Sequence, residues 1–337
     1  MYPEIPLWLS ILFVLGGLAV LAWSANVFID AASTIAHVLG VSPFIIGMVV
    51  IGFGTSAPEL CVSALSGITG HSNLSLGNAY GSAIFNIACI LGIAAVIRPL
   101  TVKPAIIFVA APALALISAF SCWLVGAGGG FSRSDGLLEL LVFAILLPLY
   151  CWFDQKNGGT QGVPGGEAAK RNASPSGKGV LLRAWIKLLV GLALLVGSSH
   201  VLVWGSVDIA RTLGVSELLI GLTIVAVGTS LPELASAVVS ARKGEHEFVL
   251  GNIVGSNLFN TLAVVGLAGA ISPFKDTSPY ILWRDLPILI TLSLSIALFG
   301  FNWRNWRAAG TVTRVKGAIW LLVFLAYTGV MIAQELN

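Results

Sequence analysis

Two glutamates, Glu59 and Glu233, lie well inside long apolar stretches of the sequence, whereas the other carboxylates lie in polar stretches or near the ends of apolar ones. A charged side chain near the middle of a bilayer costs at least about 2.5–3.5 kcal/mol. No Lys or Arg occurs at a matching depth in a neighbouring apolar stretch, so an ion pair within the protein is not expected. A bound cation is the simplest partner that the sequence predicts for these two acids.

Hydroxyl and amide side chains accompany both glutamates at helical spacing. A Thr-Ser pair precedes each glutamate by four and three residues, and in the next apolar stretch Asn, Ser and Asn follow one another at intervals of four. A shell of oxygen atoms without His or Cys is typical of sites for hard cations such as Ca²⁺. The set comprises Thr55, Ser56, Asn78, Ser82 and Asn86 with Glu59, and Thr229, Ser230, Asn252, Ser256 and Asn260 with Glu233.

A proline directly precedes each glutamate, at Pro58 and Pro232. Because proline has no amide hydrogen, it disrupts the preceding helical turn. We expect the carbonyls around Gly52–Thr55 and Ala226–Thr229 to be free to face a cavity, since broken backbone is tolerated at membrane depth only in such places. Two ionised glutamates carry a charge of −2, which one Ca²⁺ or several Na⁺ ions could neutralise.

The composition excludes an ordinary soluble domain. Apolar residues make up 57% of the 337 residues and charged residues only 10%, against about 25% charged residues in typical globular chains. The mean hydropathy is +0.94. A net charge of +3 is too small for a nucleic-acid-binding surface, and the four cysteines occur singly, so neither a disulfide framework nor a zinc site is expected.

The apolar runs predict an all-α polytopic membrane protein with ten transmembrane helices. A polar segment rich in Gly, Lys, Ser and Pro, residues 154–180, reads as a linker between two halves of five helices each, residues 1–153 and 181–337. The predicted spans lie near 6–30, 40–66, 77–97, 104–126, 136–153, 181–209, 216–241, 248–270, 281–300 and 316–334.

The distribution of basic residues predicts the orientation of the chain. With the N-terminus placed outside, four of the eighteen Lys and Arg residues fall on the outer side and the other fourteen on the cytoplasmic side. We therefore expect both termini outside, a cytoplasmic linker, and a location in the cell membrane. The four outer residues are Arg133, Arg211, Lys275 and Arg284.

Residues 40–99 align with residues 214–273 without a gap, at a constant offset of 174, and about two in five of the aligned positions are identical. The patterns GTS-x-PEL and GN-x-x-GS-x-x-FN occur in both segments. Because each half has an odd number of spans, the second copy enters the membrane from the opposite side, which makes an inverted repeat. Such repeats build many secondary transporters, with the site near the midplane. A duplication kept only for packing fits less well, because the matching residues are polar.

The paired signatures, GTSAPEL with GNAYGSAIFN and GTSLPEL with GNIVGSNLFN, resemble the two alpha repeats of the sodium/calcium exchanger family of calcium/cation antiporters. The alpha-1 motif covers about 40–99 and the alpha-2 motif about 214–273. The resemblance implies a ten-helix fold that works by alternating access, with four cation positions in a diamond. It also implies that the first and sixth spans slide as a gate.

The resemblance assigns a role to each site residue by its motif position. Glu59 and Glu233 would be the central ligands shared by Ca²⁺ and Na⁺. The carbonyls of Thr55 and Thr229 would complete the calcium position. Side chains lining the middle position would be Asn86 and Asn260. The outer sodium positions would be served by the side chains of Ser56, Ser82, Ser230 and Ser256 and the carbonyls of Gly52 and Ala226.

Asn260 stands where family members that use potassium, and some archaeal members, carry Asp. With Asn at both 86 and 260, the middle position has no ionisable group, so potassium-independent exchange is expected. The family implies about three Na⁺ for each Ca²⁺, which makes the exchange electrogenic. The two repeats are not equivalent in detail, since Ala83 corresponds to Asn257 and Tyr80 to Val254. The linker is too short for the regulatory calcium-binding loop of animal exchangers.

Two other functions remain open. A Ca²⁺/H⁺ antiporter could carry protons on the two glutamates, although protons would not need the many neutral oxygens. A cation channel is the second alternative, and it would conduct without a counter-ion. An enzyme is not expected, because no Ser/His/Asp arrangement, HExxH or nucleotide-binding loop is present. No cofactor is predicted. The expected partners are Ca²⁺, Na⁺ and the lipid bilayer, without nucleic acid or an obligatory protein partner.

Several other polar residues are expected to have structural roles. Glu139, Asp208 and Asp285 lie near the ends of predicted spans and are expected to anchor them at the membrane interface. His200, in the predicted gating span, is expected to be a hydrogen-bonded interior histidine. The glycines expected to allow close helix packing are Gly77, Gly81, Gly251 and Gly255.

Overall fold

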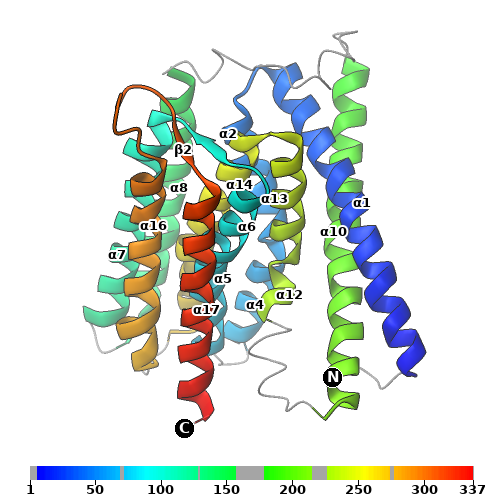
Figure 1. The fold of residues 1–337 in the computed structure, drawn as a ribbon. Helices are drawn as coiled ribbons and strands as arrows, with labels where there is room; N and C mark the ends of the chain where they lie inside the picture. Colours follow the sequence, from blue (N-terminus) through cyan, green and yellow to red (C-terminus); the bar gives the residue numbers. More distant parts are fainter. Residues whose placement is uncertain are drawn as a thin grey trace.

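The computed structural model describes residues 6–68, 72–127, 130–156, 178–214, 226–273 and 277–336. Within these ranges the chain is almost entirely helical, and most of its helices run roughly along one axis (Figure 1). Apolar runs of about 20 residues are long enough to cross the hydrocarbon core of a bilayer. Because a helix satisfies its own backbone hydrogen bonds, it is the form that such runs take in lipid.

The helices, with η denoting a π-helix, fall into two sets on either side of residues 157–177. The first set is α1 (Leu7–Leu39), α2 (Pro43–Ile45), η1 (Ile46–Ile51), α3 (Gly52–Thr55), α4 (Ala57–Ile68), α5 (Ser72–Phe85), η2 (Asn86–Leu91), α6 (Gly92–Ile97), η3 (Ile106–Ala110), α7 (Ala111–Ala127) and α8 (Arg133–Lys156). The second set is α10 (Lys178–Thr212), α12 (Ala226–Thr229), α13 (Leu231–Lys243), α14 (His246–Leu258), η5 (Phe259–Val264), α15 (Val265–Ile271), η6 (Ile281–Asp285), α16 (Leu286–Gly300) and α17 (Arg314–Leu336).

A two-stranded antiparallel ribbon is the departure from the all-helical prediction within the described ranges. Strand β1 (Leu100–Val102) pairs with β2 (Gly310–Val312), with Leu100 opposite Val312. The ribbon joins the segment after α6 to the segment before α17. The apolar runs predict only the spans, so the pairing of these two short connections could not be foreseen from them.

Nine of the ten predicted spans correspond to described helices. Eight helices are long and apolar enough to cross a membrane, and the pair Pro43–Thr55 and Ala57–Leu65, bent by 42°, forms a ninth candidate. The remaining predicted span, 216–241, is described only from Ala226 onward, where α12 and α13 lie. Its first part lies outside the described residues, as does most of the predicted linker 154–180, so the count of ten stays a prediction.

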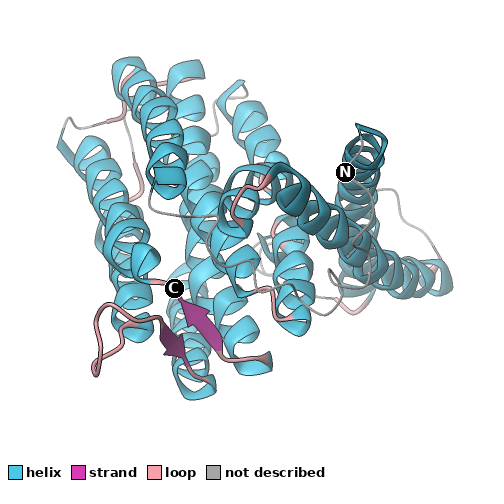
Figure 2. Cartoon of the chain, turned by 90° about the horizontal axis from the view of Figure 1, so that it is seen from above, coloured by secondary structure: helices cyan, strands magenta, loops and turns pink. Residues whose placement is uncertain are grey.

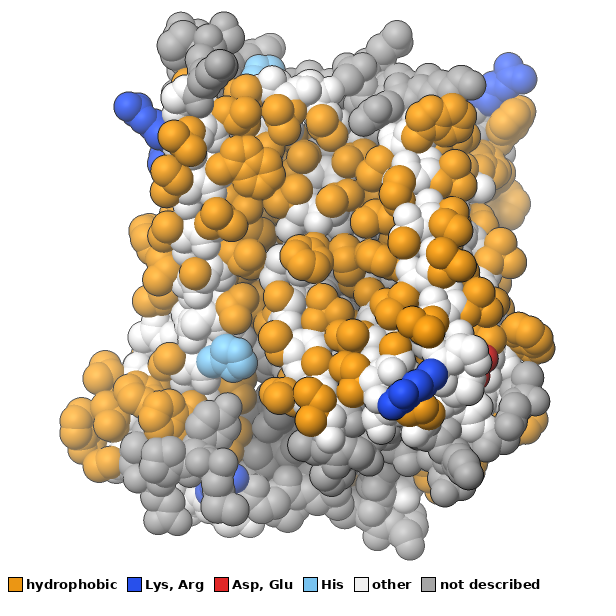
Figure 3. All heavy atoms as spheres, turned by 180° about the vertical axis from the view of Figure 1, so that it is seen from behind, with side chains coloured by type: hydrophobic (Ala, Val, Ile, Leu, Met, Phe, Trp, Pro, Cys, Tyr) orange, Lys and Arg blue, Asp and Glu red, His pale blue; other side chains and the backbone are white. Residues whose placement is uncertain are grey.

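The ends of the helices sort onto two sides of the molecule. Helix α1 begins and α17 ends at the lower end in Figure 1, whereas α8 ends and α10 begins at the upper end. Hydrophobic side chains cover most of the face seen in Figure 3, and the Lys and Arg side chains visible there lie toward its two ends. This distribution is typical of a protein whose apolar band faces lipid.

Helices α1 and α10 form a pair at one side of the bundle (Figures 1 and 2). They have 33 and 35 residues, which makes each about 50 Å long and longer than the hydrocarbon core. They run in opposite directions and pack along their length. A Cβ atom on Gly17 would lie 3.0 Å from Leu202, and one on Gly191 would lie 3.1 Å from the Phe28 backbone. Gly17 and Gly191 are separated by the repeat offset of 174.

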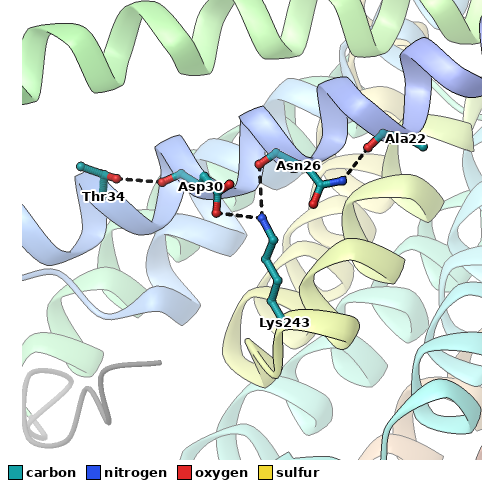
Figure 4. Close-up of polar contacts among 5 residues, drawn as sticks. All are labelled: Ala22, Asn26, Asp30, Thr34 and Lys243. Carbon is teal, nitrogen blue, oxygen red and sulfur yellow. Dashed lines mark hydrogen bonds and ion pairs between the residues drawn. The ribbon is translucent and has the colours of Figure 1, made fainter. Parts of the chain in front are cut away.

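Polar contacts connect this pair internally and to the rest of the bundle. Within the pair, the Ser10 hydroxyl donates to Asp208 at 2.5 Å. Toward the bundle, Lys243 at the end of α13 forms an ion pair with Asp30 of α1 at 2.7 Å and donates to the Asn26 carbonyl at 3.4 Å (Figure 4). The ion pair between Lys243 and Asp30 is exposed, so it adds little stability. It nevertheless holds α1 beside the end of α13 at this point.

Helix α14 packs against α2, η1 and α3 with their backbones in contact. A Cβ atom on Gly251 would overlap the Phe44 carbonyl, and one on Gly255 would overlap the Met48 carbonyl. The prediction that these two glycines allow close packing is therefore confirmed. Gly77 and Gly81 have open space beside them among the described residues. The segment that corresponds to their expected partner lies within 215–225, outside the described ranges.

The expectation of interfacial anchoring is wrong for three carboxylates, because each is buried and bonded inside the bundle. Glu139 is fully buried and accepts the Ser121 hydroxyl at 2.6 Å. Asp208 accepts the Ser10 hydroxyl. Asp285 pairs with its neighbour Arg284. The expectation for His200 is also wrong, since this residue is exposed on α10. Sequence position gives the depth of a residue along a helix, but not which face it occupies.

The contact at Gly255 generates a stability prediction. Gly255→Ala is expected to lower the stability of the detergent-solubilised protein by about 1–3 kcal/mol, because the added methyl group overlaps the Met48 carbonyl and must force α14 away from η1. Gly329→Ala in α17 is the matched control, because nothing lies within 4 Å of the added atom. Thermal unfolding measures both variants, and equal midpoints for Gly255→Ala and wild type would contradict the packing.

Candidate ion-binding site

Two interrupted helices carry the site glutamates. Helix α3 ends at Thr55 and α4 begins at Ala57, and in the same way α12 ends at Thr229 and α13 begins at Leu231. Ser56 and Ser230, at the two breaks, have similar backbone angles, with φ and ψ of −82° and 4° and of −96° and 10°. A proline is compatible with the first turn of a new helix but not with the interior of a continuous one. The breaks therefore confirm the effect predicted for the two prolines.

The prolines change the carbonyl bonding in a different way from the one predicted. In a continuous helix Pro232 would have bonded to the Gly228 carbonyl, and that carbonyl instead accepts the Ser199 hydroxyl of α10 at 2.8 Å. The Gly52 carbonyl is not left free, because it accepts the Ser56 amide at 3.0 Å. The turn around Gly52 stays helical because the break falls one turn later.

The two glutamates are connected crosswise by the serines of the opposite breaks. Ser56 donates to Oε1 of Glu233 at 3.3 Å, and Ser230 donates to Oε1 of Glu59 at 3.2 Å. The side chains of the neighbouring threonines, Thr55 and Thr229, add contacts of the same crosswise kind. Each glutamate is therefore held by the half of the chain that does not contain it, and the carboxyl groups lie at a common site between the halves.

Both glutamates are fully buried, and no ion pair among the described residues compensates their charge. The ion pairs of the described residues, such as Lys103–Glu247 and Lys243–Asp30, involve neither glutamate. In each glutamate the second carboxyl oxygen, Oε2, is buried without a hydrogen-bond partner in the described structure. Buried polar atoms are normally bonded, so these two oxygens require a proton or a bound cation.

Neutral oxygens from the next helices surround the two carboxyl groups. Ser82 of α5 contacts the Ser230 hydroxyl at 3.2 Å. On the other side, Asn252 of α14 accepts hydroxyl bonds from Thr55 and Ser256, each at 3.4 Å. The amide group of Asn252 also donates to the Glu233 carbonyl at 3.5 Å. The helix faces predicted from the spacing of four residues are therefore turned toward the glutamates.

Asn86 and Asn260 lie at matching irregularities of the backbone. Asn86 begins η2, and Asn260 is the second residue of η5. Short π-helical segments inside α-helices are frequent at functional sites. Both side chains are fully buried, and the Oδ1 atoms of both, like the two glutamate Oε2 atoms, lack a hydrogen-bond partner among the described residues.

The donor set of this site favours hard cations. No group of three or more His, Cys, Asp or Glu side chains that could hold a metal occurs in the described ranges. Among the predicted site residues, the oxygens left without partners in the described structure come from two carboxyl and two amide groups, and neutral hydroxyls lie beside them. Such a shell suits Ca²⁺ or Na⁺ better than zinc or copper, which prefer nitrogen and sulfur donors.

Most predicted site residues are thus brought together. Both glutamates, both Thr-Ser pairs, Ser82 and Ser256 take part in polar contacts at the site. The Gly52 carbonyl is engaged in a backbone bond, and Ala226 is described only as the start of α12. Sequence reasoning missed the part played by Asn257, which bonds to Asn86. The sequence did contain a signal, because the polar Asn257 in one repeat aligns with Ala83 in the other.

Comparison with known proteins identifies the family. The family model described as sodium/calcium exchanger protein matches residues 9–152 and 183–333. The chain belongs to the sodium/calcium exchanger family. Two curated relatives match this chain over nearly their whole length. The putative antiporter CaxA of Alkalimonas amylolytica is 38% identical over 94% of this chain and 96% of its own. The inner membrane protein YrbG of Escherichia coli strain K12 is 34% identical over 90% of this chain and 93% of its own.

A solved structure shares the fold of this exchanger. The sodium-calcium exchanger NCX_Mj, soaked with 10 mM Na⁺ and 10 mM Sr²⁺, superposes with a TM-score of 0.78 and 28% identity, over 97% of this chain and 99% of that one. The sodium/calcium exchanger MaX1 of Methanosarcina acetivorans is 29% identical over 96% of this chain and 98% of its own length. The family consists of transporters, and this chain is a multi-pass membrane antiporter of that family.

Proposed function

We propose that this protein exchanges Na⁺ for Ca²⁺ across the membrane by alternating access. The observation that carries the proposal is the pair of fully buried glutamates, held crosswise by Ser56 and Ser230, each with one carboxyl oxygen unpartnered in the described structure. Two ionised carboxyl groups inside lipid need a compensating charge of +2. One Ca²⁺ provides it, and Na⁺ ions on the same oxygens provide it in turn.

The stoichiometry that the family resemblance implies would make the cycle electrogenic. About three Na⁺ ions in exchange for one Ca²⁺ would move one net positive charge per cycle in the direction of sodium. The unpartnered oxygens are enough for more than one monovalent ion, because Asn86 and Asn260 add two to those of the glutamates. Their amides carry no ionisable group, so the middle position would take no part in charge compensation. We infer from this that exchange does not require potassium.

The arrangement of the helices supports an inverted repeat. Matching features in the two halves include the breaks at Ser56 and Ser230, the π-helices η2 and η5, and the close glycines Gly17 and Gly191. Helices α1 and α10, which correspond in the repeat, run in opposite directions. We propose that these two helices move as one unit over the site, because they are packed on each other and bonded through Ser10 and Asp208.

We further propose that the protein lies in the cell membrane with both termini outside. The start of α1 and the end of α17 lie at one end of the molecule, and the ends of α8 and α10 that flank the linker lie at the other (Figure 1). The excess of basic residues on the linker side favours a cytoplasmic linker. The relative YrbG is named an inner membrane protein, which agrees with this location.

The first test is transport in proteoliposomes. Glu59→Gln and Glu233→Gln are each expected to abolish Ca²⁺ uptake driven by an outward Na⁺ gradient, because a single remaining carboxyl group cannot neutralise a divalent ion. Glu139→Gln is the matched control, since Glu139 is also fully buried but bonds to Ser121 outside the ion site, and its uptake should persist. Normal uptake in either site variant would contradict the assignment.

The same assay separates the alternative functions. Ca²⁺ uptake driven by a pH gradient without sodium would favour proton coupling, and rapid Ca²⁺ flux without any counter-ion would favour a channel.

The second test concerns potassium and net charge. Replacing K⁺ by choline on both sides should leave Na⁺-driven uptake unchanged. An inside-positive potential should accelerate uptake and an inside-negative one should slow it, because three Na⁺ leave for each Ca²⁺ that enters. A potential of 100 mV is worth about 2.3 kcal/mol per charge, so the effect is measurable with ionophore-clamped vesicles. Dependence on K⁺ or indifference to the potential would contradict the proposal.

The third test concerns orientation. Ser134 and Asn305 lie in exposed segments at the two ends of the molecule. In intact cells, a membrane-impermeant maleimide should label Ser134→Cys but not Asn305→Cys, and permeabilised cells should label both. A variant without the introduced cysteines gives the background from the four native thiols. The reverse pattern would place the linker outside.

A further inference from the structure

One pair of corresponding residues, Ala83 and Asn257, differs between the halves beside the ion site. Ala83 lies in α5, three residues before Asn86, and Asn257 lies in α14, three residues before Asn260. Both positions are buried. A buried amide is costly unless its polar atoms are bonded, so the bonds of Asn257 show what the residue contributes.

The hydrogen bonds of Asn257 determine how two amide groups are oriented. Its Nδ2 atom donates to the Ala83 carbonyl at 3.2 Å. Because a backbone carbonyl can only accept, the NH₂ group of Asn257 must face Ala83, and Oδ1 must face the other way. That Oδ1 atom accepts Nδ2 of Asn86 at 3.1 Å. The NH₂ group of Asn86 is therefore turned to Asn257, and its Oδ1 atom is turned away.

The Oδ1 atom of Asn86 is the one left buried without a hydrogen-bond partner in the described structure. Asn86 lies one helical turn beyond Ser82 on the same face, about 6 Å farther along the helix. Ser82 contacts Ser230, which in turn bonds Glu59. The free oxygen of Asn86 therefore lies on the face that lines the ion site, at a position beside the one between the two carboxyl groups.

Asn260 corresponds to Asn86 in the second repeat, but within the described ranges it has no partner like Asn257. In the first repeat, the position of Asn257 is taken by Ala83, which has no polar side-chain atoms. Both Oδ1 and Nδ2 of Asn260 are buried and unbonded among the described residues. Nothing in this part of the structure selects which atom of Asn260 faces an ion, whereas the orientation of Asn86 is determined.

We propose that Asn257 is a positioning residue of the ion site, which holds Asn86 with its oxygen available to a sodium ion. The inference rests on the proposed Na⁺/Ca²⁺ exchange and adds to it a difference between the halves. Among the described residues, only the Asn86 side presents a fixed oxygen, so the two middle ligands are not interchangeable. A merely structural Asn257 would pack α14 against α5 without affecting ion affinity.

The test compares Asn257→Leu, which keeps the number and branching of the side-chain heavy atoms, with Asn257→Ala. Both are expected to raise the half-saturating Na⁺ concentration about three- to tenfold, the effect of losing one oriented polar contact. The maximal rate and the half-saturating Ca²⁺ concentration should change less than about twofold, because the calcium ligands are not oriented by Asn257. Na⁺-dependent thermal stabilisation of the purified protein measures the same shift without transport.

A double-mutant cycle shows whether Asn257 acts through Asn86. Asn86→Ala alone should raise the half-saturating Na⁺ concentration, and adding Asn257→Leu should raise it no further. With Asn260→Ala as the matched control, the effects should add. An unchanged Na⁺ affinity in Asn257→Leu, or full additivity with Asn86→Ala, would overturn the inference.

The binding readout also separates this inference from the proposed function. Wild-type protein that binds Na⁺ but shows no Na⁺-driven Ca²⁺ flux would contradict the exchange, while the double-mutant cycle on Na⁺ binding would still decide the role of Asn257. Wild-type protein that exchanges the ions normally but shows additive variants would contradict only the role of Asn257.

Discussion

The structure depends on one electrostatic constraint, which is that two carboxyl groups are buried together inside a lipid-spanning bundle without a basic side chain among the described residues to neutralise them. Desolvating a charge is costly, and desolvating two like charges side by side costs more. A mobile cation removes this cost when it binds and restores it when it leaves. Because the two carboxyl groups need a compensating charge, the conformational state of the protein depends on whether ions are bound. Coupled exchange requires such a dependence.

The backbone meets this constraint by being irregular in matching places. Breaks at Ser56 and Ser230 turn each serine toward the glutamate of the other half. Gly251 and Gly255 let α14 lie directly on η1, which brings Asn252 to Thr55, and the Ser256 hydroxyl donates to the same Asn252 oxygen. Small residues have this role in membranes because close van der Waals packing, rather than the hydrophobic effect, associates helices there.

The two halves nevertheless differ in how they hold the broken helices and the amides. The Gly228 carbonyl, released by Pro232, is satisfied by Ser199 of α10, whereas the residue corresponding to Ser199 is Ala25, which has no hydroxyl. An exposed ion pair between Lys243 and Asp30 fastens α1 to α13 (Figure 4). These contacts cross between the α1–α10 pair and the remaining helices. A protein that alternates between two states needs such contacts to be few and weak.

The sequence by itself determined most of the apolar spans, the repeated motifs and most of the residues that line the candidate site. It could do so because apolar length, the spacing of four residues and the position of proline act locally along a helix. Glu59 and Glu233 were recognisable since no other carboxylate lies so far from both ends of an apolar run. The resemblance of the motifs to one transporter family added the roles of single residues.

Only the tertiary structure decided which side chains from distant segments lie next to one another. It showed that Glu139 is bonded to Ser121 in the interior rather than at an interface, and that His200 faces outward. It also placed the Asn257 amide between Ala83 and Asn86. The sequence shows how far along a helix a residue lies. The rotation of the helix about its axis, and the side chains that it contacts on other helices, depend on packing between distant segments, which no local pattern encodes.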